Sequence, residues 1–402
     1  MEKSAPTLRF SDFEEEWKLN KLDNLLHFKN GINASKEHYG KGYKFINVLD
    51  IIQNDFITNE RIIGSVSVSE DIFKKNIVEY GDILFQRSSE TREEVGQSNV
   101  YLDKSQNATF GGFIIRGKKI GEYDPYFMHL LLKSSSARKE ITSKSGGSTR
   151  YNVGQSTLSS VQLYFPNKIE EQQKIASFLT AVDTKINQLT KRKALLEQYK
   201  KGVMQKIFSQ EIRFKDDNGN DYPEWEERRL GEVATINMGQ SPESSSYNSE
   251  GIGYYLIQGN ADISNRKTTP RNFTSKPTKL CDIGDLILTV RAPVGAVAKS
   301  NHKACIGRGV CSIKNKTISS IEFIYHFLLG YEKRWTRLEQ GSTFSAVSGK
   351  DIKSIEIKLP SIREQTKIAD FLSALDNKVE TVTTQIENTT IFKKGLLQQM
   401  FV

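Results

Sequence analysis

The sequence lacks the features that mark disulfide-rich, secreted and membrane proteins. It has three cysteines in 402 residues, Cys281, Cys305 and Cys311, an odd number that does not suit a disulfide framework. No apolar run approaches the roughly 18 residues that a membrane-spanning helix needs. The opening stretch MEKSAPTLRFSDFEEEW is too acidic and polar for a signal peptide. These absences predict a soluble, cytoplasmic protein with reduced thiols and no membrane partner.

Motifs of nucleotide-hydrolysing and metal-dependent enzymes are also missing. No G-x-x-x-x-G-K-[ST] segment occurs, which argues against a nucleotide-driven motor. The five histidines are few and unrepeated between the halves of the chain, so they indicate no catalytic triad. His302 and the three cysteines could be imagined as zinc ligands, but no C-x-x-C pair is present and the first half has no cysteine. We therefore predict buried cysteines, no bound metal and no cofactor on this chain.

Two stretches nevertheless call for comparison with enzyme motifs. Asp351, Glu356 and Lys358 in DIKSIEIK have a spacing that nucleases use to hold a metal. The same letters alternate as an edge strand with a polar outer side, and the matching first-half stretch has no acid, so the strand is favoured. DPYF at Asp124 resembles part of an amino-methyltransferase loop without its second proline, and is better explained as a helix cap followed by Pro125. The sequence argues against an enzyme, with a metal-dependent nuclease as an alternative.

What the chain does have is length, apolar residues and an excess of positive charge. Its 402 residues exceed the usual length of about 100–150 for one domain, and 37% hydrophobic residues suffice for folded cores. The 57 Lys and Arg against 48 Asp and Glu give a net charge of +9. This moderate excess favours a polyanionic partner such as nucleic acid.

The chain also contains an internal repeat. EEQQKIASFL begins at Glu170, and REQTKIADFL begins 193 positions later at Arg363. At the same offset, KKGVMQKIF from Lys200 matches KKGLLQQMF from Lys393. Upstream, EWKLNKLDNLLHFKNG resembles EWEERRLGEVATINMG, YGDILFQR resembles IGDLILTVR, and GGSTRYNV resembles QGSTFSAV. Two halves therefore share a scaffold and differ in their loops.

Each half ends in a predicted long helix. After Pro166, apolar residues recur every three or four positions from Ile175 to Ile207, with one break at Lys193, and the second copy repeats this pattern. Two equivalent stripes most simply bury each other in an antiparallel coiled coil, while the alternative is that each helix packs only on its own domain. A helix of about 38 residues would be roughly 57 Å long.

The body of each half has a mixed α/β (α+β) pattern. β-branched and aromatic runs predict strands. In each half, one run with helical apolar periodicity predicts a short helix before the GST loop. The strands are YKFINVLDI, GDILFQR, NATFGGFIIRG and SSVQLYF in the first half, and GYYLIQGNADI, GDLILTVRA, GVCSIK and IKSIEIKLP in the second. The helices are PYFMHLLLKSSSARKEI and IEFIYHFLLGYEKRW. The predicted domains are 1–166, a central helix 167–208, a linker 209–224, a second body 225–360 and a distal helix 361–402.

Basic and hydroxyl residues gather in the segments that differ between the halves. Hydroxyl groups, backbone amides and arginines of this kind suit phosphate oxygens and base edges. Any single arginine among them could equally be a solvated surface charge. The candidate DNA-binding residues are Arg87, Arg92, Lys144, Ser148, Thr149, Arg150, Tyr151, Asn260, Arg266, Lys267, Arg271, Arg291, Ser342, Thr343 and Lys350. Two similar bodies with different loops would recognise two short DNA sequences, which we call words, at a fixed spacing.

Taken together, these landmarks resemble the specificity subunits of type I restriction-modification systems. The resemblance covers the EW entry to each half, GD before a strand, GST followed by FP or LP, and the duplicated E-Q-x-K-I-A helix start. It implies two target recognition domains on double-stranded DNA and two spacer helices, at Glu171–Phe208 and Glu364–Phe401. The residues that would set the spacing and dock partners are Gln172, Ile175, Phe178, Leu179, Val182, Gln365, Ile368, Phe371, Leu372 and Leu375.

The resemblance also implies that the chain itself is not catalytic. Two methyltransferase (modification) subunits would carry S-adenosylmethionine, and restriction subunits would carry ATP and Mg²⁺. The second helix, with ETVTTQIENTT against KRKALLEQYKK in the first, leaves open whether both copies dock partners equally. A stand-alone bipartite DNA-binding regulator is the other alternative to this hypothesis.

Overall fold

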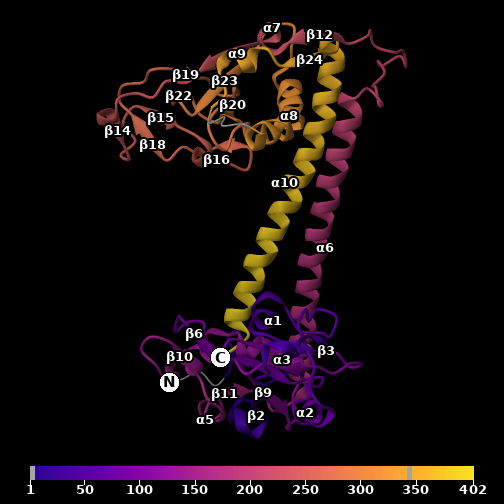
Figure 1. Cartoon of the computed structure of the whole chain (residues 1–402), viewed down its shortest axis with the longest axis vertical. Helices are drawn as coiled ribbons and strands as arrows, with labels where there is room; N and C mark the ends of the chain where they lie inside the picture. Colours follow the sequence, from indigo (N-terminus) through magenta and orange to yellow (C-terminus); the bar gives the residue numbers. More distant parts are fainter. Residues whose placement is uncertain (1–4, 342–345) are drawn as a thin grey trace. The chain divides into compact units, whose positions relative to one another are not determined.

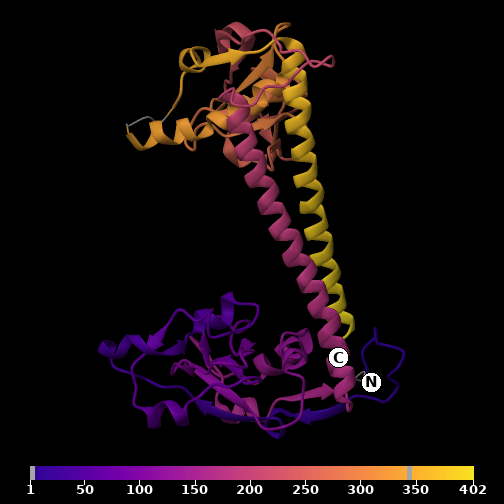
Figure 2. The same ribbon diagram turned by 90° about the vertical axis from the view of Figure 1, so that its right-hand side faces the viewer.

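The computed structural model describes residues 5–341 and 346–402, and the chain divides into two units (Figure 1). The first unit comprises Met1–Leu189 and Gln385–Val402, and the second comprises Thr190–Thr384. The division falls within the two longest helices, α6 (Ile169–Phe208) and α10 (Ile362–Gln399), which are continuous ribbons in Figure 2. Each long helix therefore contributes one part to each unit. The domain limits drawn from sequence landmarks remain a prediction.

The first unit is built on an antiparallel sheet with strand order β2-β9-β5-β7. A second sheet, β4-β3-β8, pairs β3 with β8 in parallel. The strands are β1 (Lys18–Lys21), β2 (Leu26–Asn30), β3 (Tyr39–Ile46), β4 (Ser65–Val66), β5 (Ile83–Gln86), β6 (Ser88–Ser89), β7 (Ser98–Val100), β8 (Thr109–Phe110), β9 (Ile114–Lys119), β10 (Tyr151–Asn152) and β11 (Gln162–Phe165). The shorter helices are α1 (Val48–Gln53), α2 (Glu70–Lys75), α3 (Pro125–Leu132), α4 (Ser135–Ser143) and α5 (Gln155–Ser159).

The second unit has two sheets of the same kind, each with more strands. Their strand orders are β13-β23-β20-β21-β17-β16 and β14-β18-β15-β22-β19. The strands are β12 (Glu226–Arg229), β13 (Ala234–Met238), β14 (Tyr247–Asn248), β15 (Tyr254–Ile257), β16 (Ile263–Ser264), β17 (Lys267–Thr268), β18 (Asn272–Thr274), β19 (Leu280–Cys281), β20 (Leu286–Thr289), β21 (Val297–Lys299), β22 (Ala304–Ile306), β23 (Val310–Asn315) and β24 (Glu356–Leu359). The helices are α7 (Leu230–Val233), α8 (Ile321–Gly341) and α9 (Gly349–Lys353).

The predicted repeat is confirmed at the level of topology. The order β2-β9-β5-β7 in the first unit corresponds to β13-β23-β20-β21 in the second. The parallel pair β3–β8 corresponds to β15–β22, and the antiparallel pair β1–β11 to β12–β24. In both units, a strand entered from the EW landmark pairs with the strand that leads into a long helix. The two halves thus share the same strand pairings, although their loops differ in length and sequence.

The predicted helices and most predicted strands are confirmed, with local corrections. Asp124 caps α3 by accepting hydrogen bonds from two backbone amides, with Pro125 in the first turn. The strand predicted over YKFINVLDI is wrong in its second part, because Asn47 and Asp50 form a capping box that starts α1. Similarly, GYYLIQGNADI is a strand only to Ile257 and continues into a short 3₁₀ helix. Local side-chain hydrogen bonds outweighed the β-branched composition: a capping box at α1, and at the second place the bond from the backbone N–H of Gln258 to Asp262 Oδ2 at 2.8 Å.

A buried carboxylate joins the start of α6 to the first body. Glu171 accepts two hydrogen bonds from Arg9, with Nε–Oε1 at 2.7 Å and Nη2–Oε2 at 2.8 Å. The indole Nε1 of Trp17 donates to Glu171 Oε1 at 3.1 Å, and Glu171 and Trp17 are both almost fully buried. A charge in this setting is stabilised only while its partners stay in place. We call Glu171, Arg9 and Trp17 the first latch.

The start of α10 has the same arrangement in the second unit. Glu364 is fully buried and accepts hydrogen bonds from Arg213 Nη2 at 3.1 Å and from Trp225 Nε1 at 3.1 Å. We call Glu364, Arg213 and Trp225 the second latch. The glutamates and tryptophans are landmarks of the sequence repeat, whereas the arginines were not predicted. Their signal was the short repeat L-R-F at Leu8 and I-R-F at Ile212.

The glutamine that follows each latch glutamate is hydrogen-bonded to the start of a helix in its own body. Gln172 Oε1 accepts from the backbone N–H of Asp124 at 3.0 Å, where α3 begins. Gln365 Oε1 accepts from the backbone N–H of Ser320 at 2.8 Å, just before α8, and its Nε2 donates to the carbonyl of Pro360 at 2.8 Å. These bonds satisfy backbone groups that helix starts leave unpaired. The E-Q pair in the repeated motif is therefore a structural joint.

Reciprocal ion pairs connect the two long helices. Lys393 on α10 contacts Asp183 on α6 in the first unit, with Nζ–Oδ1 at 2.5 Å. Lys200 on α6 contacts Asp376 on α10 in the second unit. Both the aspartates and the lysines are 193 positions apart, so the two pairs are copies of one contact. Because the early part of each helix meets the late part of the other, the predicted antiparallel pairing is confirmed.

The apolar stripes of the helices do more than bury each other. Ile175 and Leu179 lie in the core of the first body together with Leu396 of α10 and Met400, which follows that helix. In the second body, the core includes Ile207 of α6 together with Ile368, Leu372 and Leu375 of α10. The alternative, that each helix packs only on its own domain, fits the start of each helix but not its end, which lies in the core of the other body. Each body contains the start of one helix and the end of the other.

The cysteine prediction is confirmed: Cys281, Cys305 and Cys311 are buried and not disulfide-bonded. Each unit also has one buried histidine on a corresponding helix, His129 on α3 and His326 on α8. The two histidines are not at equivalent positions, because the match of Phe127 with Phe323 beside the two tryptophans places His129 opposite Tyr325.

Burial makes both histidines resist protonation. Burial, followed by the charges of Lys133 and Lys393, lowers the pKa of His129 well below its ordinary value of 6.5. Burial, followed by the charge of Lys200 and then that of Lys299, lowers the pKa of His326 to about 3. The unfolded chain binds these protons near pH 6.5, whereas the folded chain does not. Stability from the neutral rings is therefore present above pH 6.5 and is lost as the pH falls below it.

We expect the free energy of unfolding to fall on the order of 1.5 kcal/mol per histidine between pH 6.5 and pH 5. Urea denaturation of the His129→Gln/His326→Gln double variant should show a correspondingly smaller loss over this range. The exposed His27 offers a matched control, since His27→Gln should leave the pH dependence of the wild type unchanged. A double variant with the full pH dependence would contradict the assignment.

Candidate nucleic-acid interface

In the first unit, the structure brings two predicted loops together. The chain that follows β5 forms β6, which pairs with β10 at the end of the GST loop, placing Ser89 opposite Tyr151. The backbone N–H of Val153 donates to the carbonyl of Arg87 at 3.0 Å. Arg87, Ser148, Thr149 and Arg150 are exposed, and Tyr151 is half-buried. The two loops therefore present their side chains from one shared platform, which we call the first platform (residues 87–95 and 144–151).

Two basic side chains of the first platform donate hydrogen bonds to backbone carbonyls of the same unit. Arg92 Nε donates to the carbonyl of Thr142 at 3.1 Å, so this arginine links the loop after β5 to the end of α4. Lys144 Nζ donates to the carbonyl of Ser160 at 2.8 Å and lies 3.1 Å from a carboxylate oxygen of Glu140. These contacts are exposed and contribute little to stability. They orient the loops on which Arg87 and Arg150 are displayed.

The second unit builds the corresponding platform. Arg291 follows β20, is exposed, and forms an antiparallel bridge with Ala346. The backbone N–H of Val347 donates to the carbonyl of Val290 at 2.9 Å, as Val153 does to Arg87 in the first unit. Lys350 follows, exposed, on α9. We call residues 290–294 and 346–350 the second platform. The predicted Ser342 and Thr343 lie outside the described residues.

The other basic candidates of the second unit form ion pairs within it. Arg266 contacts Glu332 of α8, with Nη2–Oε2 at 3.0 Å. Lys267 Nζ lies 2.8 Å from Glu380 Oε1 on α10. Arg271 Nε lies 3.2 Å from Asp262 Oδ1. Asn260 is exposed on the 3₁₀ helix Asn260–Asp262. Arg266, Lys267 and Arg271 would have to share or exchange these carboxylates to contact a phosphate.

The predicted partner-docking residues lie mainly inside the chain's own bodies. Gln172, Ile175, Leu179, Gln365, Ile368, Leu372 and Leu375 are buried, and Val182 packs on the first core. Phe178 packs edge-on against Phe10, with ring centroids 5.8 Å apart, and Phe371 packs against Phe214 in the same way at 5.6 Å. These contacts position the helices, and the role of the ten residues in docking partners remains a prediction.

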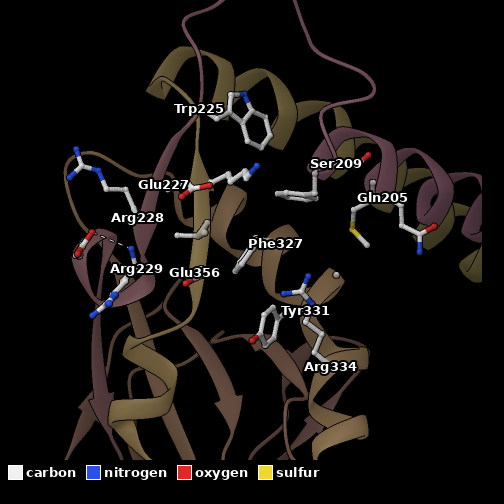
Figure 3. A pocket seen from close by; sticks show the side chains of 16 residues that line it. Gln205, Ser209, Trp225, Glu227, Arg228, Arg229, Phe327, Tyr331, Arg334 and Glu356 are labelled. Atoms are coloured by element: carbon white, nitrogen blue, oxygen red, sulfur yellow. Dashed lines mark hydrogen bonds between the residues drawn. The ribbon is translucent and has the colours of Figure 1, made fainter.

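The residues of the nuclease alternative point to different structural tasks. Asp351 caps α9 by accepting from Ser348 N at 3.0 Å and from Ser348 Oγ at 2.6 Å, and these hydrogen bonds lower the pKa of Asp351. Glu356 and Lys358 lie on the outer side of β24, whose residues alternate between exposed and buried as predicted. They line a cavity of about 630 Å³ in the second unit, with Trp225 and Phe327 (Figure 3). Among residues 5–341 and 346–402, no group of three or more His, Cys, Asp or Glu side chains is placed to hold a metal ion.

No helix within the described residues is both long and apolar enough to cross a membrane. The long helices α6 and α10 are instead amphipathic, since apolar positions alternate with exposed charged positions along each.

Comparisons with known proteins agree with this architecture. The family model of the type I restriction modification DNA specificity domain matches twice, at residues 14–198 and 222–389. The MjaX specificity subunit of Methanocaldococcus jannaschii, a type I restriction enzyme subunit, is 32% identical over 98% of this chain and 95% of that protein. The EcoKI specificity subunit of Escherichia coli is 23% identical over 96% of this chain and 88% of that protein.

Solved structures share the fold. The S subunit of a type I restriction-modification system from M. genitalium has a TM-score of 0.61 and 17% identity, covering 99% of both chains. The HsdS subunit of Thermoanaerobacter tengcongensis has a TM-score of 0.52 and 23% identity, covering 96% of both. The repeated domain matches and the full-length relatives lead to one conclusion: the chain belongs to the family of type I restriction-modification specificity subunits.

Proposed function

We propose that this chain reads a bipartite site on double-stranded DNA, with each platform contacting one word. The observation that carries the proposal is the pair of platforms, built on matching strands from loops that differ in length and letters. Exposed Arg87 and Arg150 in the first unit and Arg291 and Lys350 in the second can reach base edges and phosphates. A constant frame with variable loops is the arrangement expected of a protein that changes its target without changing its fold.

The spacing between the words would depend on the long helices. The family resemblance implies that α6 and α10 act as spacer helices, so the separation between the words should be constant. We expect little tolerance for an altered gap between them. A flexible linker would instead accept a range of gaps.

We further propose that the chemistry belongs to partner subunits. Two methyltransferase subunits would supply S-adenosylmethionine, and restriction subunits would supply ATP and Mg²⁺, as the family resemblance implies. This chain would supply sequence recognition and an assembly scaffold, and the complex would act where both words are bound.

Two exposed aromatic side chains support a pair of equivalent docking positions. Tyr199 on α6 is 53% exposed in the second unit, and Phe392 on α10 is 55% exposed in the first. They are 193 positions apart, so the repeat places them at corresponding points of the two helices. Exposed aromatics are frequent anchors of protein interfaces. Two copies of one methyltransferase subunit would each bind one of them.

Exchanging one body should change one word only. Replacing residues 225–360 with the corresponding body of another family member should alter the second word of the methylated sequence and leave the first intact. The measurement is genome-wide detection of methylated adenines in cells that express the exchanged chain with its methyltransferase. A change in both words, or in neither, would show that the bodies do not read independently.

Removing one aromatic anchor should weaken one of the two docking events. In native mass spectrometry of the reconstituted complex, Tyr199→Ser or Phe392→Ser should lower the affinity for one methyltransferase copy at least tenfold, shifting the main species from two copies to one. Ile283 in the second body is 71% exposed, and Ile283→Ser is the matched control. If both aromatic variants retain two copies at wild-type affinity, these residues are not the anchors.

A further inference from the structure

The loops that carry the platform arginines end in the same way. In the first unit, residues 87–95 lead to Gly96, whose backbone N–H donates to the carbonyl of Gln86 at 3.0 Å. In the second unit, residues 290–294 lead to Gly295, whose N–H donates to the carbonyl of Thr289 at 2.9 Å. Both glycines have positive φ, +65° at Gly96 and +89° at Gly295. The loops differ in length, but each closes on a left-handed glycine over the last residue of its central strand.

Each of these glycines lies directly against a helix residue. A Cβ on Gly96 would come within 3.0 Å of Ile141 Cγ2 on α4, and a Cβ on Gly295 would come within 3.0 Å of Trp335 Cδ1 on α8. Ile141 and Trp335 are both buried. Each occurs seven positions before the serine of its own GST segment, so the contact is a copy of one feature. A side chain at either glycine would therefore push the loop away from its helix.

The same helices make further contacts beside these glycines. In the first unit, Arg138 of α4 donates from Nη2 to the carbonyls of Glu93 at 2.9 Å and Val95 at 2.6 Å, immediately before Gly96. In the second unit, Trp335 packs edge-on against Tyr331, with ring centroids 5.3 Å apart, which restricts where the indole can move. The helix that leads into each GST segment thus holds the returning end of the arginine loop.

We propose that Ile141 and Trp335 are specificity-determining positioning residues, which set the height and tilt at which the arginine loops meet DNA. The glycine contact is common to both units, whereas the helix residue differs greatly in size between them. A small Ile141 beneath a nine-residue loop and a large Trp335 beneath a five-residue loop would present their arginines differently. This inference rests on the proposed function, and it adds residues that need not touch DNA themselves.

Trp335 provides a direct probe of this contact. The indole N–H groups of Trp17 and Trp225 are bonded to the latch glutamates, whereas Trp335 Nε1 is buried without a hydrogen-bond partner within the described part of the chain. The three tryptophans should therefore give distinguishable indole signals in ¹⁵N-correlated NMR spectra of the full chain. On adding duplex DNA that carries both words, the Trp335 signal should shift, and those of Trp17 and Trp225 should stay in place.

The decisive variant is Gly295→Ala, for which the chain offers a matched control. Gly284 has nearly the same backbone strain, with φ of +90°, but a Cβ added there would meet nothing within 4 Å. Binding of the full chain to DNA duplexes would be measured with either word altered, the words being taken from the methylated genomic sequence. Gly295→Ala should lose at least tenfold in discrimination of the second word and keep discrimination of the first. Gly284→Ala should keep both at wild-type levels.

The first unit supplies the reciprocal experiment. Gly96→Ala should impair the first word only, with Gly40→Ala as its control, since Gly40 has a φ of +88° and open space around it. If Gly295→Ala does not fold, Trp335→Leu withdraws the indole without straining the glycine and should give the same selective loss. Unchanged discrimination in the folded variants, or equal losses in variants and controls, would overturn the proposal. Absence of sequence-specific binding by the wild type would instead refute the proposed function.

Discussion

The structure depends on two buried carboxylates, Glu171 and Glu364, each placed at the start of a long helix. Each accepts hydrogen bonds from one arginine and one tryptophan that precede the first strand of its body. Removing one partner of a buried ion pair commonly costs about 3–5 kcal/mol, because the remaining charge is left uncompensated. The latches therefore commit the entry segment, the body and the helix start of each unit to one arrangement.

Around these joints, the chain separates constant from variable parts. The glutamines next to the latch residues hold the helices that precede the GST segments, and the aspartate–lysine pairs hold α6 against α10. The arginine loops and GST segments project from this frame with different lengths in the two units. Variation in such loops need not disturb the core, which is how one scaffold can serve different DNA sequences.

Much of this organisation could be predicted from the sequence. The repeat at an offset of 193 located both long helices, and because it covered Asp183 with Asp376 and Lys200 with Lys393, it contained both ion pairs. The arginines of the latches could not be found in that way, because they lie outside the stretch matched at this offset and pair with residues 162 and 151 positions away. Nor could the contacts of Gly96 and Gly295, since loop lengths shift the register between the halves. Charge alone also could not separate Arg291, which is displayed, from Arg266, which pairs with Glu332.

We infer that each latch holds its own unit independently of the other. The sharpest experiment is hydrogen–deuterium exchange of the Glu364→Ala variant, with Glu171→Ala as the reciprocal variant. Glu364→Ala should lower the protection of backbone amides in residues 225–360 on the order of a hundredfold, as expected for about 3 kcal/mol, while residues 17–166 keep wild-type protection. Equal loss of protection in both bodies, or no loss in the second, would contradict it.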